Sequence, residues 1–275
     1  MLGKMNLRDR TAVVTGAASG IGRAIAISLA RRGCHLALAD INETQLAQTA
    51  DLAASPGVRI SRHRLDVADR AAVAAFPAIV MAEHGKVDIL VNDAGVALGG
   101  TFDQVSESDF EWLFDINFWG VVRMTRAFLP HLRASDDARI VNLSSLYGLI
   151  APPGQTAYAA SKFAVRGFSQ SLRHELEGSR IGVTVVHPGG VATAIAKSAR
   201  IPRGLLSPAE EAKRRAAAEK LLRMPPATAG EIIVQGIERR RPRVIVGTDA
   251  KILAVLERLA PVSYWRILGK LRPQM

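Results

Sequence analysis

The sequence has few of the residues that build metal sites and disulfide frameworks. Only one of its 275 residues is a cysteine, Cys34, which excludes an internal disulfide and cysteine-rich zinc sites. The six histidines are scattered, and none follows HExxH or a similar ligand spacing. We therefore expect no metal, and we expect Cys34 to be a buried small hydrophobic residue rather than a reactive thiol.

Long hydrophobic runs and aromatic residues are also scarce. No stretch of about 18 uncharged apolar residues could cross a bilayer, and the start, Met1 to Arg10, lacks the apolar run of a signal peptide. These absences predict a cytoplasmic protein. The net charge is +11, but aromatic residues make up only 5% and no RNA-binding motif is present. We therefore expect no nucleic-acid partner.

Apolar, β-branched segments alternate with segments whose apolar residues recur at helical spacing. The predicted strands are 11–16, 35–40, 58–66, 87–92, 138–145, 181–188 and 243–247, and the predicted helices include 21–32, 43–54, 68–84, 107–133 and 156–177. Strict alternation of strand and helix indicates βαβ units and a parallel sheet with helices on both faces. The sequence predicts a Rossmann-like α/β fold, with a doubly wound, seven-stranded sheet in one domain over 1–248.

Two segments depart from this alternation. Residues 193–224 are punctuated by Pro and Gly and then become helical and charged, which predicts a lid over a crevice at the carboxyl ends of the strands. Residues 249–275 form an amphipathic extension interrupted by Pro261. Two interpretations of this extension stay open: packing within an oligomer, or peripheral contact with a membrane through Tyr264, Trp265 and nearby basic residues.

The first predicted strand leads into a glycine-rich turn that is typical of nucleotide binding. Its residues are Gly16, Ser19, Gly20, Ile21 and Gly22. Glycines allow a tight turn and close approach to a pyrophosphate, and the following helix offers free N–H groups at its start. A plain turn without a ligand is the alternative.

Two acidic residues end the next predicted strands. Asp40 stands where a carboxylate can bind the adenosine ribose, and it would repel a 2′-phosphate, which favours NAD over NADP. A helix N-cap is the alternative role. Asp66 could accept a hydrogen bond from the adenine amine, and ordinary turn chemistry explains it equally well.

A tyrosine and a lysine occupy one face of a predicted helix. Tyr158 and Lys162 have i,i+4 spacing, and an ammonium close to a phenol favours the phenolate, as general acid–base chemistry requires. Ser145 ends the fifth predicted strand, at the sheet edge where ligands bind in such folds. Strand alternation directs its rival, Ser144, to the other face. His187 could contact a substrate or be structural.

Several motifs in order make the sequence resemble the short-chain dehydrogenase/reductase family over about residues 7–248. They are TGAASGIG (15–22), Asp66, NDAG (92–95), Asn117, the serine of NLSS (142–145), YAASK (158–162) and HPGGVAT (187–193). The resemblance implies that Tyr158 is the catalytic acid/base and that Ser145 binds the substrate oxygen. It also implies that Lys162 binds the nicotinamide ribose and lowers the tyrosine pKa, and that Asn117 holds a water next to Lys162.

The same resemblance implies further cofactor contacts and an assembly. The expected contacts are Val67 beside Asp66, then Asn92, Ala94 and Gly95 under the cofactor, and Pro188, Gly189, Val191 and Thr193 at the nicotinamide. It implies the strand order 3-2-1-4-5-6-7 and a homodimer or homotetramer through helices 107–133 and 156–177. One departure is Asp93, where the family usually has a second Asn. An ionised carboxylate cannot donate a hydrogen bond.

The expected substrate pocket is apolar. Its expected lining is Val96, Leu98, Ser145, Leu146, Leu149, Ile150, Pro152 and Tyr158. This lining predicts an NAD-dependent oxidoreductase that interconverts an alcohol and a carbonyl on a lipophilic small molecule. The alternatives are an NADPH-dependent 3-oxoacyl-type reductase and a non-catalytic nucleotide-binding scaffold.

Overall fold

A computed structural model of the chain describes residues 3–202, 210, 216 and 220–271. The strands are β1 (Thr11–Thr15), β2 (His35–Asp40), β3 (Ile60–Arg64), β4 (Ile89–Asn92), β5 (Ala138–Leu143), β6 (Ile181–Pro188) and β7 (Arg243–Val246). All pair in parallel in one sheet, in the order β3-β2-β1-β4-β5-β6-β7. The predicted fold class and strand order are therefore confirmed.

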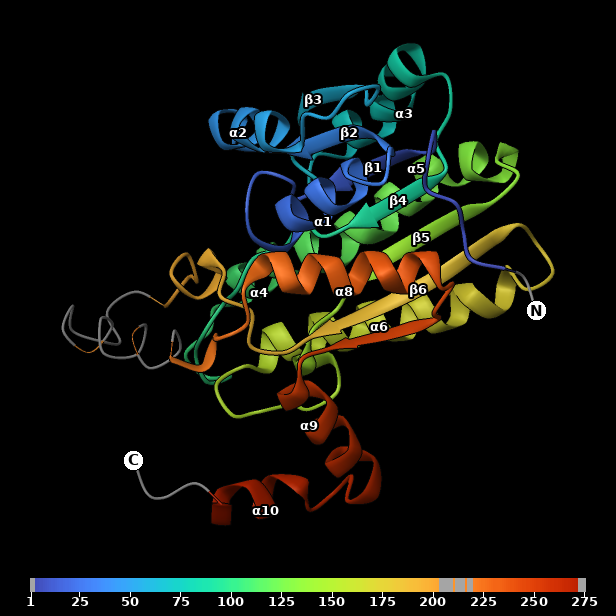
Figure 1. Cartoon of the computed structure of the whole chain (residues 1–275). Helices are drawn as coiled ribbons and strands as arrows, with labels where there is room; N and C mark the ends of the chain where they lie inside the picture. Colours follow the sequence, from blue (N-terminus) through green and yellow to red (C-terminus); the bar gives the residue numbers. More distant parts are fainter. Residues whose placement is uncertain (1–2, 203–209, 211–215, 217–219, 272–275) are drawn as a thin grey trace.

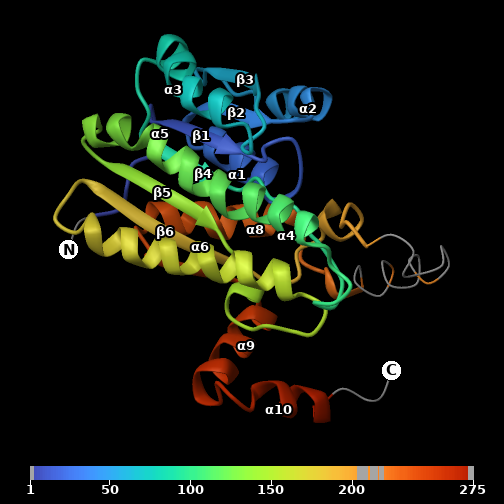
Figure 2. The ribbon, with the colours of Figure 1, turned by 180° about the vertical axis from the view of Figure 1, so that it is seen from behind.

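Helices cover both faces of the sheet (Figures 1 and 2). They are α1 (Gly20–Ala30), α2 (Glu43–Ala53), α3 (Arg70–His84), α4 (Glu107–Phe114), α5 (Gly120–Ala134), α6 (Thr156–Glu175), α8 (Pro226–Glu238), α9 (Thr248–Leu259) and α10 (Tyr264–Leu271). One core cluster joins α1, α2 and α8 to the sheet, and a second joins α3, α5 and α6 to the opposite face. Successive strand residues supply the two cores in turn, as Val13 and Val14 do, because side chains alternate along a strand.

The predicted helix 107–133 is interrupted. A π-helical turn, Asp115–Trp119, separates α4 from α5 and adds a residue to one turn. Its buried Asn117 faces inward, toward the carboxyl edge of the sheet. The hydrophobic periodicity continues through the turn, so the sequence pattern did not reveal it.

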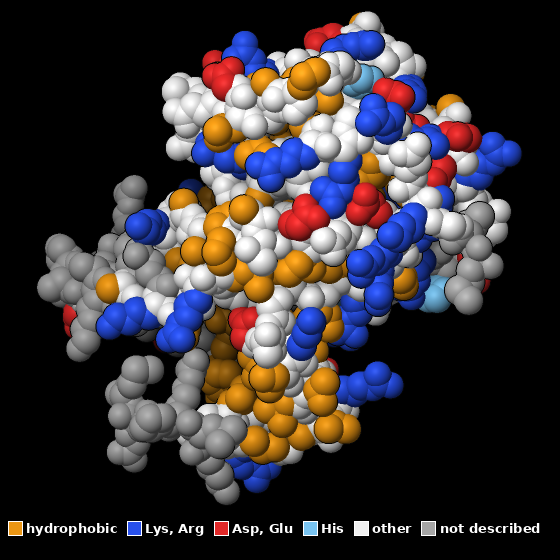
Figure 3. All heavy atoms as spheres, in the orientation of Figure 1, with side chains coloured by type: hydrophobic (Ala, Val, Ile, Leu, Met, Phe, Trp, Pro, Cys, Tyr) orange, Lys and Arg blue, Asp and Glu red, His pale blue; other side chains and the backbone are white. Residues whose placement is uncertain are grey.

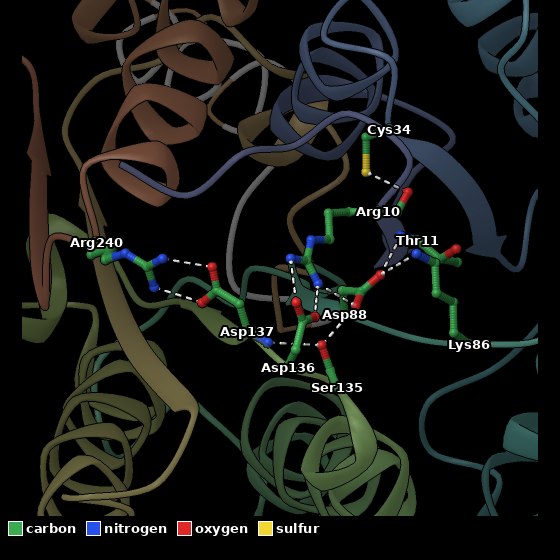
Figure 4. Close-up of polar contacts among 9 residues, drawn as sticks. All are labelled: Arg10, Thr11, Cys34, Lys86, Asp88, Ser135, Asp136, Asp137 and Arg240. Atoms are coloured by element: carbon green, nitrogen blue, oxygen red, sulfur yellow. Dashed lines mark hydrogen bonds and ion pairs between the residues drawn. The ribbon is translucent and has the colours of Figure 1, made fainter. Parts of the chain in front are cut away.

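The amino edge of the sheet carries a network of ion pairs (Figure 4). The buried Asp88 accepts hydrogen bonds from the Thr11 amide at 2.9 Å, the Arg10 guanidinium at 3.0 Å and the Ser135 hydroxyl at 2.6 Å. Arg240 makes two bonds of 2.6 Å to Asp137 in the same region. A buried carboxylate with several partners is a stabilising arrangement, and this network ties β1, β4 and the start of β5 together at the edge opposite the candidate active site.

The C-terminal helices α9 and α10 project from the end of the sheet that carries β7 (Figures 1 and 2). The extension predicted at 249–275 begins at Thr248, and Pro261 lies between its two helices. The predicted lid, 193–224, lies partly outside the described residues. Its described start includes a short 3-10 turn, Ala194–Ala196, and a bridge between Arg200 and Leu98.

Candidate active site

A cavity of about 730 Å³ opens at the carboxyl ends of β4, β5 and β6, and its walls are mainly apolar. Thirteen residues of the predicted cofactor and substrate sites line it: Ile21, Gly95, Leu98, Ser145, Leu146, Ile150, Pro152, Tyr158, Lys162, Pro188, Gly189, Val191 and Thr193. Parallel strands bring their carboxyl ends to one edge, so segments far apart in sequence meet here. The cavity is large enough for a drug-sized organic molecule.

Two hydroxyl groups meet in the cavity wall. Ser145 follows β5 in an extended conformation, and its Oγ accepts a hydrogen bond from the Tyr147 amide at 3.1 Å. Burial raises the pKa of Tyr158 to about 12, while a side-chain hydrogen bond with Ser145 acts to lower it. The hydroxyl of the neighbouring Ser144 is instead engaged by the Lys162 carbonyl, to which it donates at 2.8 Å. Ser145 and Tyr158 can therefore bind one substrate oxygen together.

Lys162 lies one helical turn after Tyr158. Its Nζ is 5.7 Å from the centre of the Tyr158 ring and donates to the Leu143 carbonyl at 3.1 Å. Burial lowers the pKa of Lys162 to about 8, against the opposing charge of Asp93. Burial is the largest influence on the pKa of Tyr158, and the Lys162 ammonium lies over its ring. The expectation that Lys162 lowers the tyrosine pKa stays a prediction.

Asn117 fixes the loop that follows β4. Its Oδ1 accepts from the Val96 amide at 2.8 Å, and its Nδ2 donates to the Val96 carbonyl at 3.0 Å and to the Ser161 hydroxyl at 3.2 Å. The side chain is thus fully engaged in positioning this loop beside Lys162. The water-holding role implied by the resemblance stays a prediction.

The glycine-rich turn between β1 and α1 is closely packed. Gly16 and Gly20 have φ angles of +68° and +55°, which favour glycine. A Cβ on Gly16 would lie 2.8 Å from the Ala94 amide nitrogen, and one on Gly22 would lie 2.3 Å from the Gly16 carbonyl oxygen. The N-cap, Ser19, makes no side-chain capping bond. The first N–H groups of α1 thus fit an anionic group such as a phosphate.

Asp40 sits beside this turn at the end of β2. Its two carboxylate oxygens accept from the Ala18 and Asn42 amides, each at 3.0 Å. The N-cap of α2 is Asn42, so the N-cap interpretation of Asp40 is wrong. Asp66 accepts from the Ala68 amide at 2.9 Å, which is the bond that its turn interpretation predicts.

Five further residues that the sequence analysis singled out also lie outside the cavity lining. Asn92 is buried within the sheet, where its amide donates to Thr125 and Asn142. Val67 is buried against Gly120 of α5. Val96 and Leu149 were expected to line the cavity, and neither does. Val96 packs on the cluster of Leu98 and Leu113, and Leu149 is buried in the turn after β5. The fifth residue, His187, is buried and bonds the Ser145 carbonyl at 3.0 Å.

The C-terminal extension forms a wall of the cavity that the sequence analysis missed. Leu253, Trp265 and Leu268 line it. Tyr264 Oη accepts a hydrogen bond from the Ala151 amide at 2.9 Å, and Asp249 accepts from the Gly190 amide at 2.8 Å. The amphipathic pattern indicated that the extension has an apolar face. It could not show that part of this face lines the cavity.

The sequence analysis also did not predict the contacts of Asp93. Its carboxylate oxygen lies 2.7 Å from where a Cβ on Gly22 would be, and it accepts a hydrogen bond from the Gly22 amide. Burial raises the pKa of Asp93 to about 7, although the Lys162 ammonium acts to lower it. The acidic substitution therefore contacts the glycine-rich turn and interacts electrostatically with Lys162.

Comparison with known proteins agrees with this arrangement. The family model described as "short chain dehydrogenase" matches residues 10–203. The chain belongs to the short-chain dehydrogenase family. A family relative, the "Putative oxidoreductase SadH" of Mycobacterium tuberculosis, is 46% identical over 268 residues, which cover 96% of this chain and 95% of the relative.

Solved structures of other short-chain dehydrogenases share the fold. A family member from Burkholderia phymatum in complex with NAD has a TM-score of 0.85 and 31% identity, covering 94% of this chain and 95% of that one. An alcohol dehydrogenase from Thermococcus sibiricus complexed with 5-hydroxy-NADP has a TM-score of 0.72 and 27% identity, covering 86% and 94%. The family thus includes structures with each type of nicotinamide nucleotide. This chain is an oxidoreductase of that family.

Two kinds of feature are absent from the described residues. None of their helices is both long and apolar enough to cross a bilayer. Within the same part of the chain, no three His, Cys, Asp or Glu side chains gather where they could hold a metal ion.

Proposed function

We propose that this protein interconverts an alcohol and a carbonyl on a lipophilic small molecule, using NAD(H) as the redox partner. The observation that carries the proposal is the meeting of the Ser145 and Tyr158 hydroxyls in the wall of an apolar cavity. Both can hydrogen-bond one substrate oxygen, and Tyr158 can exchange a proton with it. A nicotinamide bound beside them would accept or supply the hydride.

The residues present fit such a cofactor. The glycine-rich turn and the start of α1 would hold the pyrophosphate, and Asp40 would bind the adenosine ribose. Pro188, Gly189 and Thr193, which line the cavity, would contact the nicotinamide. A Cβ on Gly20 would lie 3.1 Å from the Thr193 methyl group, so the loop after β6 reaches the glycine-rich turn.

The protonation of Tyr158 favours one role at neutral pH. Because its pKa is raised to about 12, Tyr158 keeps its proton and can donate it to a carbonyl oxygen as the alcohol forms. The oxidation direction needs the phenolate, so it should accelerate as the pH rises. Lys162, whose pKa is lowered to about 8, would lose its charge over part of the same range.

The apolar walls support a lipophilic substrate. Leu98, Leu146, Ile150, Ile195, Leu253 and Trp265 are among the lining residues. A small sugar would leave most of its hydroxyls without partners against these side chains.

The NADPH-dependent alternative has one observation in its favour. Arg64 pairs with Asp40 across the β2–β3 register and is exposed, so a cation is available near the position of a 2′-phosphate. We still favour NAD, because the carboxylate of Asp40 is fixed beside the glycine-rich turn by two backbone amides.

Fluorescence titration with NADH and NADPH tests the cofactor assignment. We expect NADH to bind more tightly and Asp40→Ala to erase that preference. A preference for NADPH that Arg64→Ala removes would establish the 3-oxoacyl-type alternative as the better hypothesis. If neither nicotinamide nucleotide binds, the proposed redox function is wrong and a non-catalytic scaffold role becomes the better hypothesis.

A screen of apolar alcohols and ketones against Tyr158→Phe tests the chemistry. General acid–base catalysis contributes about 10²–10⁴-fold, so turnover should fall by that factor while NADH affinity stays the same. Full activity in Tyr158→Phe would refute the proposed acid/base.

A further inference from the structure

The C-terminal helices expose an apolar surface. Ile252, Val255 and Leu259 of α9, Val262 of the following turn and Ile267 of α10 are 61%, 58%, 78%, 90% and 37% exposed. We call these five residues the C-terminal patch. Figure 3 shows hydrophobic side chains gathered over α9 and α10 at the lower end of the molecule. A contiguous apolar surface of this kind marks an interaction site.

Helix α9 presents different residues on different sides. Ile252, Val255 and Leu259 follow i, i+3 and i+7 spacing and so form one row along the helix. Leu253, about 100° away around the helix, lines the cavity. One side of the helix therefore belongs to the cavity, and another side lacks cover in the described chain.

Basic residues border the apolar row. Lys251 and Arg258 are exposed and seven residues apart, so they lie in a row of their own beside Ile252 and Leu259. Arg243 of β7 lies close enough to Arg258 for the two positive charges to repel each other. The pKa of Arg243 is lowered, first by burial and then by Arg166 of α6, with Arg258 adding to the effect and Glu257 opposing it. Cations that repel one another in this way suit an anionic partner.

The patch and the cavity share the same two helices. Trp265 and Leu268 of α10, with Leu253 of α9, form one cavity wall. Figure 3 shows a hollow lined with hydrophobic atoms directly above the patch. A partner seated on the patch would therefore lie next to the cavity.

We propose that the C-terminal patch docks on the surface of an anionic lipid bilayer, with the cavity beside that surface. The apolar row would enter the boundary between headgroups and acyl chains, and the basic row would contact the anionic headgroups. Passage of a lipophilic substrate between bilayer and cavity rests on the function proposed above, whereas the docking does not.

A second copy of the chain fits the patch less well. A two-fold interface places the same surface on both partners, so it would bring both copies of Lys251 and Arg258 into one interface and add their like charges. An anionic bilayer complements those rows, and the +11 charge of the whole chain adds to the attraction.

Co-sedimentation of the full-length protein with sucrose-loaded vesicles tests the proposal. Vesicles of phosphatidylcholine alone are compared with vesicles in which phosphatidylglycerol replaces a third of the lipid. We expect clear binding to the anionic vesicles, weak binding to the neutral ones, and weaker binding as salt is added. Absence of binding to both would overturn the proposal.

Two double variants assign the binding to the patch. Leu259→Ser/Val262→Ser removes apolar side chains, and Lys251→Glu/Arg258→Glu reverses the basic row. Each should weaken binding by at least about tenfold. The first removes apolar side chains from the boundary between headgroups and acyl chains, and the second removes basic residues that each contribute about 1 kcal/mol near an anionic surface. The matched controls, Leu52→Ser/Ile79→Ser and Arg62→Glu/Arg70→Glu, change exposed residues on α2, α3 and β3. The second control lowers the net charge by the same four units as the basic-row variant, and both controls should bind far more strongly than the patch variants.

Further measurements separate the remaining outcomes. Unchanged binding by both patch variants would show that another surface contacts the lipid and would overturn the proposal. If no vesicles bind and Leu259→Ser/Val262→Ser lowers the oligomeric mass in analytical ultracentrifugation, the patch is an interface between copies. Tyr158→Phe should bind vesicles normally, so failure of the proposed chemistry would not be mistaken for failure of docking.

Discussion

Replacing Asp93 by Asn should make the protein more stable at neutral and alkaline pH. Burial raises the pKa of Asp93 from 3.8 to about 7. Below pH 3.8 the folded and unfolded chains both hold this proton. As the pH rises toward 7 the unfolded chain loses the proton and the folded chain keeps it, so the unfolded state is increasingly favoured. Above about pH 7 the cost is constant.

The size of the effect follows from the change in pKa. One pKa unit corresponds to about 1.4 kcal/mol, so the change from 3.8 to about 7 sets an upper bound of about 4 kcal/mol on this cost. Asparagine has nearly the same shape, stays neutral, and its oxygen can still accept the Gly22 hydrogen bond. We therefore expect Asp93→Asn to gain about 1–4 kcal/mol above pH 7 and nothing below pH 4.

Urea unfolding followed by tryptophan fluorescence from pH 4 to pH 9 measures this difference. The control is Asp51→Asn, which removes an exposed carboxylate from α2 and should show no such rise. If Asp93→Asn is no more stable than the unmodified chain above pH 7, the ionised Asp93 carboxylate does not destabilise the folded state. Its contacts with Gly22 and Lys162 would then outweigh its burial.

Three further changes have defined outcomes. Asn117→Ala leaves the Val96 amide without its side-chain partner, so the free energy of unfolding should fall by about 1–3 kcal/mol, and turnover should fall in steady-state assays. Glu231→Gln should lower the urea midpoint at pH 7 by much more than at pH 2. Bonding to Arg32 and then Gln235 lowers the Glu231 pKa to about 2, so its stabilisation is present above pH 4.5 and lost as the pH falls through 2. Trp265→Ala should raise KM for long apolar substrates about tenfold while changing kcat less, because it removes cavity wall rather than hydroxyls. An unchanged urea midpoint or an unchanged KM, respectively, would contradict the last two.

The fold could be predicted because each parallel strand is buried on both faces. Such strands are nearly continuous apolar runs, and helical periodicity between them leaves one topology class. The ends were less certain: β3 covers Ile60–Arg64 rather than 58–66, and β4 begins at Ile89 rather than 87. Polar residues at strand ends belong equally well to turns, so the pattern alone could not place these boundaries.

The meeting of Ser145, Tyr158 and Lys162 was also predictable, for a local reason. Helical spacing places the tyrosine and lysine on one face, and a strand end places the serine at the sheet edge. The inward direction of Asn92 and the packing of Val96 and Leu149 were not predictable. Asn92 is oriented by hydrogen bonds to Thr125 and Asn142, which lie 33 and 50 residues away in sequence. Val96 packs on a cluster that includes the distant Leu113 and Ala157.

The position of α9 and α10 changes how the C-terminal extension has to be tested. A chain ending near Thr248 would lose the exposed patch, but it would also lose Leu253, Trp265 and Leu268 from the cavity wall. It would further lose Asp249, whose carboxylate holds the Gly190 amide in the loop after β6. Truncation would therefore weaken substrate binding and lipid binding together, and neither loss could be assigned. Substitutions confined to Leu259 and Val262, which lie on the exposed side, separate the two because they leave the cavity wall in place.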